Sequence, residues 1–320
     1  KLSKIQKDTS FNKEDIEVNE GLSSESQEIM AGYTTIALFG LDNRSNGNLS
    51  KGNSDVIMIA SINNDTHAVK LVSVYRDSYL DIGGGTFKKC NSAYAKGGPE
   101  AAINMLNKNL DLSITDYVTV DFNAVVECVD LLGGITLDEV TDEEAVLMQG
   151  YMDEINKLTK NNSKYLSGGG TNVEMDGVQA CAYARIRYTT GDDYKRTERQ
   201  RTVLTAMVQK AQKANLTTIN SLIDELFGDI KTSFSNTELI SLAAKVFNYS
   251  LGETIGFPFE KNTTTLGNKG SVVVPCDLES NVKQLHVFLY DDNEYAPTDT
   301  VKNNSAQIVN DTGFHQGEGY

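Results

Sequence analysis

Five of the seven arginines of this chain lie in one short stretch, CAYARIRYTTGDDYKRTERQR, which runs from Cys181 to Arg201. The whole chain carries 29 lysines and arginines against 44 aspartates and glutamates, a formal net charge of -15. A local excess of guanidinium groups in an acidic protein suits a small anion with phosphate-type oxygens, which arginine binds through paired hydrogen bonds. A nucleic-acid groove would need a broad basic surface, so we expect no nucleic-acid partner.

The arginine-rich stretch divides into two parts. ARIRY has the composition of a short strand, which would place Arg185 and Arg187 on one face. The side chains that follow share one face of a predicted helix start: Arg196, Arg199 and Gln200. A solvated helix start, in which neighbouring carboxylates neutralise the arginines, remains the alternative reading of TERQR. Two half-buried strand arginines need anionic partners that the stretch itself does not supply.

Two carboxylates flank the first apolar runs of the chain. Asp42, in GLDNR, follows the first run, and Asp55, in NSDVIM, precedes the second. If these runs are antiparallel strands, both carboxylates lie at one sheet edge, and Arg76 after the third run lies near Asp55. Such a group suits a Mg²⁺ ion that keeps several waters and bridges to substrate phosphates. Aspartates that only cap turns remain the alternative for either residue alone.

Other sequence patterns indicate which kinds of binding and catalysis to expect. KKCNSAYAKGG places Lys89, Asn91 and Tyr94 before a predicted helix N-terminus, which attracts anions. The three histidines lie outside the motif-like segments and no G-x-S-x-G turn occurs, so serine–histidine catalysis is not expected. The four cysteines show no metal-ligand spacing. We expect buried free thiols, with a disulfide as the alternative.

The pattern of apolar residues predicts the strands and helices that position these side chains. TTIALFG, DVIMIASI and AVKLVSVY predict three strands, the last two joined as an antiparallel hairpin at Asn63–Asp65. A helix is predicted after Pro99, a strand at DYVTVDF, and a helix at FNAVVECVDLL that ends before Gly133. RTERQRTVLTAMVQKAQKA predicts a long helix, and Ser235 with Glu238 marks the start of another.

The interleaved strands and helices predict an α/β fold with helices on both faces of the sheet. Residues 1–32 are polar and predict a stalk or linker, and the tail after about Val301 is predicted to be mobile. No run reaches the roughly 18 apolar residues of a membrane span.

In order along the chain, these segments resemble the LytR-CpsA-Psr family of cell-wall glycopolymer ligases. The likeness runs through GLDNR, NSD, SVYRD, KCNSAY, DYVTVDF, VDLLGGI, ARIRY and DDYKRTERQ, about residues 33–210. The resemblance implies a single three-layer α-β-α domain with a mixed central sheet. It also implies a juxtamembrane stalk at 1–32, a catalytic domain at 33–255, and a C-terminal extension at 256–320 that packs on the core and ends in a mobile tail.

The activity that the resemblance implies is phosphotransfer. Family members attach a lipid-linked glycopolymer, such as teichoic acid or capsular polysaccharide, from polyprenyl pyrophosphate to peptidoglycan, with pyrophosphate hydrolysis as a side reaction. The implied cofactor is Mg²⁺ or Mn²⁺. The implied location is the extracytoplasmic face of the cell membrane of a Gram-positive bacterium, held by an N-terminal anchor that this chain does not contain.

Carried over position by position, the resemblance assigns Asp42 and Asp55 to the metal. The pyrophosphate ligands would be Arg44, Arg76, Lys89, Arg185, Arg187, Arg196 and Gln200. Among these Arg76 and Arg187 would be catalytic, and Asp193 is proposed as an orienting group or base.

Two departures from the family pattern concern the expected phosphate site. Asn53 stands where the family usually has arginine, with Lys51 as a candidate to compensate, and Tyr75 stands where it usually has proline. A non-catalytic binder of the lipid-linked polymer therefore remains an alternative. A regulatory or scaffolding envelope ectodomain is another.

Overall fold

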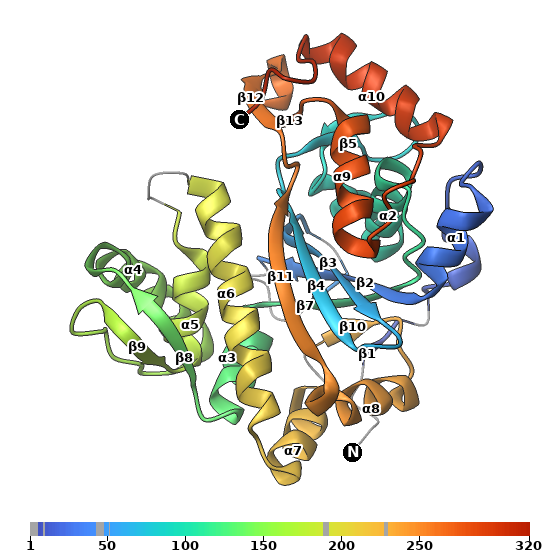
Figure 1. Ribbon diagram of the computed structural model, residues 1–320. Helices are drawn as coiled ribbons and strands as arrows, with labels where there is room; N and C mark the ends of the chain where they lie inside the picture. Colours follow the sequence, from blue (N-terminus) through green and yellow to red (C-terminus); the bar gives the residue numbers. More distant parts are fainter. Residues whose placement is uncertain (1–5, 9, 43–47, 51, 188–191, 227–229) are drawn as a thin grey trace. The chain divides into compact units, whose positions relative to one another are not determined.

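The computed structural model describes residues 6–8, 10–42, 48–50, 52–187, 192–226 and 230–320 (Figure 1). Contacts between residues divide the chain into two compact units. Unit 1 comprises residues 1–7, 43–49 and 120–249, and unit 2 comprises residues 8–42, 50–119 and 250–320. Arg44 and Lys51, which the sequence analysis singled out, lie outside the described residues.

Unit 2 holds the predicted N-terminal strands together with the C-terminal part of the chain. Its elements are η2 (Lys13–Asp15), α1 (Ser24–Ala31), β2 (Tyr33–Leu41), β3 (Ser54–Asn63), β4 (Ala68–Val74), β5 (Tyr79–Asp81), β6 (Phe87–Lys89), α2 (Ser92–Leu110), β7 (Asp116–Val120), β11 (Ser250–Phe257), β12 (Lys261–Thr265), η4 (Gly267–Lys269), β13 (Ser271–Pro275), α9 (Leu278–Tyr290) and α10 (Asp299–Thr312).

Within unit 2, a mixed sheet has the strand order β7-β2-β3-β4-β11, and β5–β6 and β12–β13 form separate two-stranded sheets. β2, β3 and β4 pair antiparallel, and β11 lies parallel to β4. The predicted hairpin between β3 and β4 is confirmed: the side chain of Asn63 accepts hydrogen bonds from the backbone N–H groups of Asp65 and Thr66 and closes the turn.

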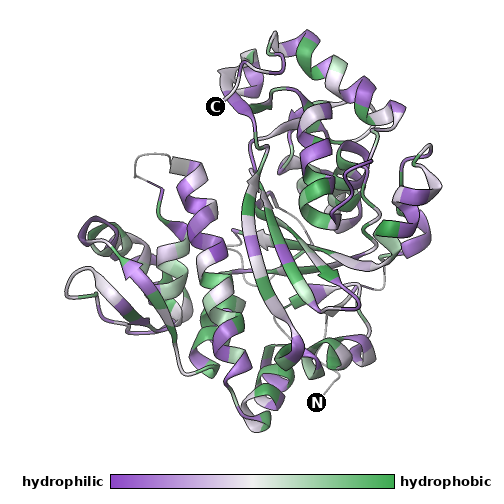
Figure 2. Ribbon diagram, viewed as in Figure 1, coloured by the Kyte–Doolittle hydropathy of each residue, from purple (hydrophilic) through white to green (hydrophobic). Residues whose placement is uncertain are grey.

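Helices α2 and α9 cover one face of this sheet. Tyr94 of α2 packs edge-on against Phe39, with ring centroids 5.3 Å apart, and Tyr290 of α9 hydrogen-bonds Thr35 at 2.9 Å. Thr35 and Phe39 lie on the same side of β2 because side chains alternate along a strand. Burial of an aromatic ring such as Phe39 stabilises the fold by about 1.5–3 kcal/mol. Figure 2 shows hydrophobic residues, drawn in green, along these strands.

Unit 1 carries the arginine-rich stretch. Its elements are β1 (Gln6–Lys7), α3 (Phe122–Leu131), β8 (Ile135–Val140), α4 (Asp142–Thr159), β9 (Gly170–Met175), α5 (Gly177–Arg185), α6 (Asp192–Gln212), α7 (Leu216–Leu226), β10 (Ile230–Thr232), α8 (Asn236–Ala244) and η3 (Val246–Asn248). Its core includes Val129, Met148, Met152, Ile155 and Ile186, all buried. The predicted caps at Gly133–Gly134 and Ser235 are confirmed, since both glycines have positive φ and Ser235 forms a capping box with Glu238.

The strand predicted at ARIRY is wrong. Asp176 and Gln179 form a capping box that starts helix α5, and the helix continues through Arg185. Gly177 lets α5 approach α3, because a Cβ at this position would overlap the backbone of Val126. The helical burial pattern of VQACAYA therefore extends into the segment that the sequence analysis assigned to a strand.

The chain ends differ from the predicted linker and mobile tail. In unit 2, Asn19 of the predicted linker and Thr298 before the predicted tail both hydrogen-bond the buried carboxylate of Asp111, at 2.6 Å and, from the Thr298 hydroxyl, at 2.7 Å. Thr298 caps α10, and Val301 and Ile308 of that helix are fully buried. The polar composition of the tail led to the prediction of mobility, because it outweighed the helical spacing of these two apolar residues. The domain boundaries at 32 and 255 stay predictions.

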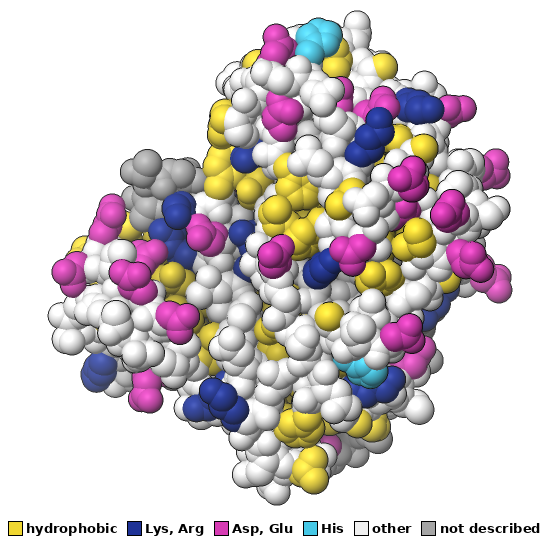
Figure 3. All heavy atoms as spheres, viewed as in Figure 1, with side chains coloured by type: hydrophobic (Ala, Val, Ile, Leu, Met, Phe, Trp, Pro, Cys, Tyr) yellow, Lys and Arg dark blue, Asp and Glu magenta, His cyan; other side chains and the backbone are white. Residues whose placement is uncertain are grey.

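The fold class is confirmed as mixed α/β with a central mixed sheet. All four cysteines are free, as expected. Within the described ranges, no helix is both long and apolar enough to cross a bilayer. On the face drawn in Figure 3, lysine and arginine side chains are interspersed with carboxylates, and the described residues of that face form no broad basic patch.

Candidate functional site

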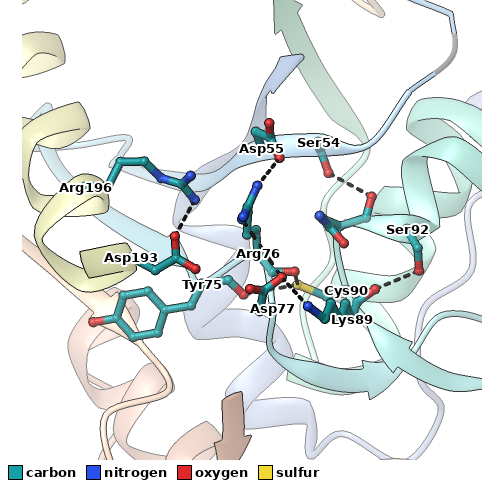
Figure 4. Close-up of polar contacts among 11 residues, drawn as sticks. Ser54, Asp55, Tyr75, Arg76, Asp77, Lys89, Cys90, Ser92, Asp193 and Arg196 are labelled. Carbon is teal, nitrogen blue, oxygen red and sulfur yellow. Dashed lines mark hydrogen bonds and ion pairs between the residues drawn. The ribbon is translucent and has the colours of Figure 1, made fainter. Parts of the chain in front are cut away.

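Asp55 and Arg76 form an ion pair at the end of the β3–β4 ladder. Met58 pairs with Ser73 and Ile62 with Val69, so continuing the ladder brings Asp55 opposite Arg76. One guanidinium nitrogen, Nη1 of Arg76, lies 2.7 Å from Oδ1 of Asp55, as Figure 4 shows. The pairing predicted from the hairpin is therefore present, and both side chains stay partly exposed, 19% for Arg76 and 24% for Asp55.

Asp77 is a member of this cluster that the sequence analysis missed. Its Oδ1 lies 3.9 Å from Nε of Arg76 and 3.4 Å from Nζ of Lys89. Figure 4 draws it between these two cations. The signal was available, because Asp77 directly follows Arg76 in SVYRD. Lys89 reaches it since Tyr79 pairs with Lys89 in the β5–β6 hairpin. The two cations are thus held together by one carboxylate.

The segment Cys90–Asn91 fixes the backbone of Arg76. The thiol of Cys90 donates hydrogen bonds to the carbonyls of Tyr75 and Arg76, at 3.3 and 3.4 Å. The N–H of Asn91 donates to the Arg76 carbonyl at 3.1 Å, while its carbonyl accepts from the N–H of Ser54 at 3.3 Å. Burial raises the pKa of the Cys90 thiol, so this cysteine is a buried donor and not a reactive thiolate.

Tyr75 takes a role that proline could not fill. Its backbone N–H donates to the carbonyl of Phe257 in β11 at 2.9 Å, and proline has no N–H. Its ring lies against Gly256, where any Cβ would overlap the Tyr75 hydroxyl. The departure from the family pattern before Arg76 is therefore accommodated within unit 2 by a glycine.

Asp42 lies at the same end of the β2–β3 ladder as Asp55. Gly40 pairs with Val56 and Leu41 with Ser54, so Asp55 lies at this register shift and Asp42 follows the last paired residue of β2. The Asp42 side chain is exposed. Among the described residues, no group of three or more His, Cys, Asp and Glu side chains is arranged to hold a metal ion.

Arg185 is built into the helical packing of unit 1. Its guanidinium lies over the rings of Phe122 and Tyr151, 4.4 and 5.3 Å from their centroids, and one nitrogen is 3.1 Å from the Glu154 carboxylate. A second nitrogen, Nη1, is buried and has no hydrogen-bond partner in the described part of the chain. Arg187 lies two residues beyond the end of α5 and is partly exposed, so the two arginines do not share a strand face.

The first turn of α6 holds Asp193, the expected orienting group or base. Its Oδ1 lies 3.0 Å from Nη2 of Arg196 (Figure 4). Gln200 follows one turn later on the same side and is half-buried, and no described residue hydrogen-bonds its buried Oε1 atom. The proposed base is thus ion-paired with one of the proposed phosphate ligands.

Arg199 and Arg201 are not the surface charges that a solvated helix start would give. They are 5% and 8% exposed. Nε of Arg199 lies 2.8 Å from Oε1 of Glu144 in α4, and Nη1 donates to the Ile186 carbonyl at 3.4 Å. Arg199 therefore ties α6 to α4 and to the end of α5.

Comparisons with known proteins place these motifs in one family. A model of the LytR_cpsA_psr family matches residues 2–269. The polyisoprenyl-teichoic acid–peptidoglycan teichoic acid transferase TagU of Enterococcus faecalis is 31% identical over 212 residues, 65% of this chain and 64% of the relative. TagV of Bacillus subtilis, named for the same transfer, is 27% identical over 197 residues, 60% of this chain and 48% of the relative.

A solved structure supports the fold. The crystal structure of protein gbs0355 from Streptococcus agalactiae matches with a TM-score of 0.69 at 23% identity, covering 86% of this chain and 93% of that one. The chain spans between about half and two thirds of the length of the curated relatives above. The resemblance drawn from the sequence motifs is confirmed.

Proposed function

Because this chain belongs to the LytR_cpsA_psr family, we propose that it transfers an anionic glycopolymer from a polyprenyl-pyrophosphate lipid to peptidoglycan. TagU and TagV are named for the transfer of teichoic acid to peptidoglycan. In the proposed reaction, an acceptor hydroxyl oxygen attacks the glycan-linked phosphorus and the phosphoanhydride bond breaks. Polyprenyl phosphate leaves, the hydroxyl proton passes to a base or to water, and a phosphodiester joins glycan to acceptor.

The observation that carries this proposal is the cluster of Arg76, Lys89, Asp55 and Asp77 in unit 2. Cleavage of a phosphoanhydride builds negative charge on the departing phosphate, and fixed cations stabilise that charge without a histidine. The thiol of Cys90 and the N–H of Asn91 donate to the Arg76 carbonyl and hold the Arg76 backbone in place before substrate arrives. A preorganised cation stabilises the transition state more than a mobile one does.

A divalent cation is compatible with this cluster. Asp42 and Asp55 would hold it, with substrate phosphate oxygens and waters completing the shell, as Mg²⁺ prefers. One carboxylate oxygen of Asp55 is 2.7 Å from Arg76, which leaves the other for an ion. The ion would neutralise charge on the phosphates. Mn²⁺ would serve the same purpose.

For the arginine-rich stretch we keep the family assignment as part of the proposal. Arg187, Arg196 and Gln200 would bind the pyrophosphate, with Arg44 as a further ligand. Arg185 would contribute its buried Nη1. Asp193 would orient Arg196, which lies 3.0 Å away, or accept the acceptor proton.

We propose that the protein works at the extracytoplasmic face of a Gram-positive cell membrane, through an N-terminal anchor outside this chain. The substrate lipid resides in that membrane and the acceptor polymer lies outside it, so the reaction needs access to both. Teichoic acid and capsular polysaccharide are both glycopolymers that such a site would accept.

A direct test incubates the full chain with a polyprenyl-pyrophosphate glycan, peptidoglycan and MgCl₂. The proposal predicts glycan bound to peptidoglycan and release of polyprenyl phosphate, both suppressed by EDTA. Tight lipid binding without turnover would instead favour a non-catalytic binder, which Asn53 in place of the usual arginine makes the second candidate. The absence of both lipid binding and turnover would favour a scaffolding ectodomain.

A further inference from the structure

The side chain of Asn91 is buried without a hydrogen-bond partner among the described residues. The residue is 7% exposed, and no described group donates to or accepts from its amide. Asparagine before a helix commonly accepts a hydrogen bond from the first turn, yet Asn91 has helical φ and ψ angles, -61° and -21°, and makes no such cap. A largely buried polar side chain that makes no hydrogen bond to the described protein can serve a ligand.

The backbone of Asn91 is attached to the two motifs that form the cation cluster. Its N–H donates to the carbonyl of Arg76, and its carbonyl accepts from the N–H of Ser54, which precedes Asp55. Lys89 lies two residues earlier and contacts Asp77 at 3.4 Å. The backbone that carries the Asn91 side chain is therefore held between the Arg76 and Ser54–Asp55 motifs, two residues after Lys89.

We propose that the amide N–H of Asn91 donates a hydrogen bond to a phosphate oxygen of a diphosphate held by Arg76 and Lys89. This proposal rests on the proposed function for the diphosphate and adds a neutral ligand to the cationic ones. A neutral donor beside two cations satisfies a phosphate oxygen without adding repulsion between like charges.

The matched variants separate binding from stability. Asn91→Asp keeps the size of the side chain, and it loses no helix cap because Asn91 makes none. It replaces the donor with a negative charge that repels a diphosphate. Asn91→Ala removes the amide altogether. Asn12→Asp adds the same charge at an exposed cap that already bonds the N–H of Glu14, and serves as the control.

The experiment measures the Kd of the full chain for inorganic pyrophosphate, geranyl diphosphate and geranyl monophosphate by calorimetry, together with the Tm of each variant. We expect Asn91→Asp and Asn91→Ala to weaken geranyl diphosphate binding by about tenfold or more, as for loss of a hydrogen bond to a charged group. Asn91→Asp should melt as the wild type does, and Asn12→Asp should bind as the wild type does. If inorganic pyrophosphate shows the same loss, the amide contacts the phosphates and not the lipid.

Unchanged geranyl diphosphate affinity in both Asn91 variants would overturn the proposal, as would an equal loss in Asn12→Asp or no measurable binding of diphosphate by the wild type. Should Asn91→Asp fail to fold, Asn91→Ser takes its place with the same expectation. A wild-type protein that binds diphosphate through Asn91 yet never transfers glycan would refute the proposed function and leave this inference standing.

Discussion

The guanidinium of Arg76 lies 2.7 Å from the carboxylate of Asp55, which joins an expected phosphate ligand to an expected metal ligand. Removing either residue should therefore disturb the other. We expect Arg76→Ala and Asp55→Asn each to lower the glycan transfer rate by about 10²–10³, as for loss of one charge-stabilising group. The double variant should be little worse than either single one, because groups that act as a unit are not additive.

The control for this cycle is the exposed pair Lys70–Asp291 in the same unit, 3.3 Å apart. Lys70→Ala and Asp291→Asn should leave the transfer rate within about twofold, since an exposed ion pair contributes little. Additive losses in the Arg76/Asp55 cycle would show that the two residues act separately.

Gly256 should tolerate no side chain while Tyr75 is present. A Cβ at Gly256 would overlap the Tyr75 hydroxyl, so Gly256→Ala is expected to lower the free energy of unfolding by about 1–3 kcal/mol. Gly252→Ala in the same strand meets only ordinary contacts and is the control. Urea denaturation of both variants, with and without Tyr75→Phe, measures the effect. If Tyr75→Phe does not even partly restore the stability of the Gly256→Ala variant, the Tyr75 hydroxyl is not the cause, since phenylalanine removes only that group.

Arg199 should matter for stability, unlike the exposed lysine beside it in α6. Its pair with Glu144 has side chains 6% and 13% exposed, and removing one partner of such a buried pair by Arg199→Met should cost about 3 kcal/mol. Lys195→Ala breaks a pair with both side chains more than half exposed and should cost less than about 0.5 kcal/mol. Equal denaturation midpoints for the two variants would show that the pair of Arg199 with Glu144 does not stabilise the packing of α6.

His286 should make the fold sensitive to acid. Burial lowers the pKa of its imidazole, against weaker opposite effects of the Leu110 carbonyl, Asp111 and Asp292. Its Nε2 donates to the Leu110 carbonyl at 2.9 Å, and buried Nδ1 has no partner among the described residues. An unfolded histidine takes up its proton near pH 6.5, so the free energy of unfolding should fall as the pH drops below about 6.5.

The measurement for His286 is thermal unfolding between pH 7.5 and 5. His286→Gln should flatten that pH dependence, while His315→Gln at an exposed position should not change it. A wild-type Tm that stays constant over this range, or an equal slope in His286→Gln, would contradict the assignment.

The apolar periodicity of the chain predicted what local pairing determines. The apolar runs that form β2, β3 and β4, with a turn at Asn63, were enough to place Asp55 beside Arg76. ARIRY was misread because a five-residue segment satisfies strand and helix patterns alike, and the capping box at Asp176 decides between them.

Spacing drew attention to Asn91 and could have done so for Asp77, but it could not predict their contacts. Asp77 contacts Lys89 because β5 pairs with β6, and Asn91 is connected to Arg76 by a backbone hydrogen bond. The burial of Arg199 likewise depends on Glu144, 55 residues away along the chain. Contacts of this kind follow from tertiary packing, which local propensity does not encode.

The central claim is that a phosphoryl group moves with the glycan. The most direct measurement uses a lipid substrate whose glycan-linked phosphate carries ³²P, incubated with the full chain, peptidoglycan and MgCl₂. We predict that the label appears in peptidoglycan in a one-to-one ratio with unlabelled polyprenyl phosphate released, and that Arg76→Ala abolishes both. Label that remains with the lipid while unlabelled glycan reaches peptidoglycan would contradict phosphoryl transfer, and label found only as soluble phosphate would reduce the activity to hydrolysis.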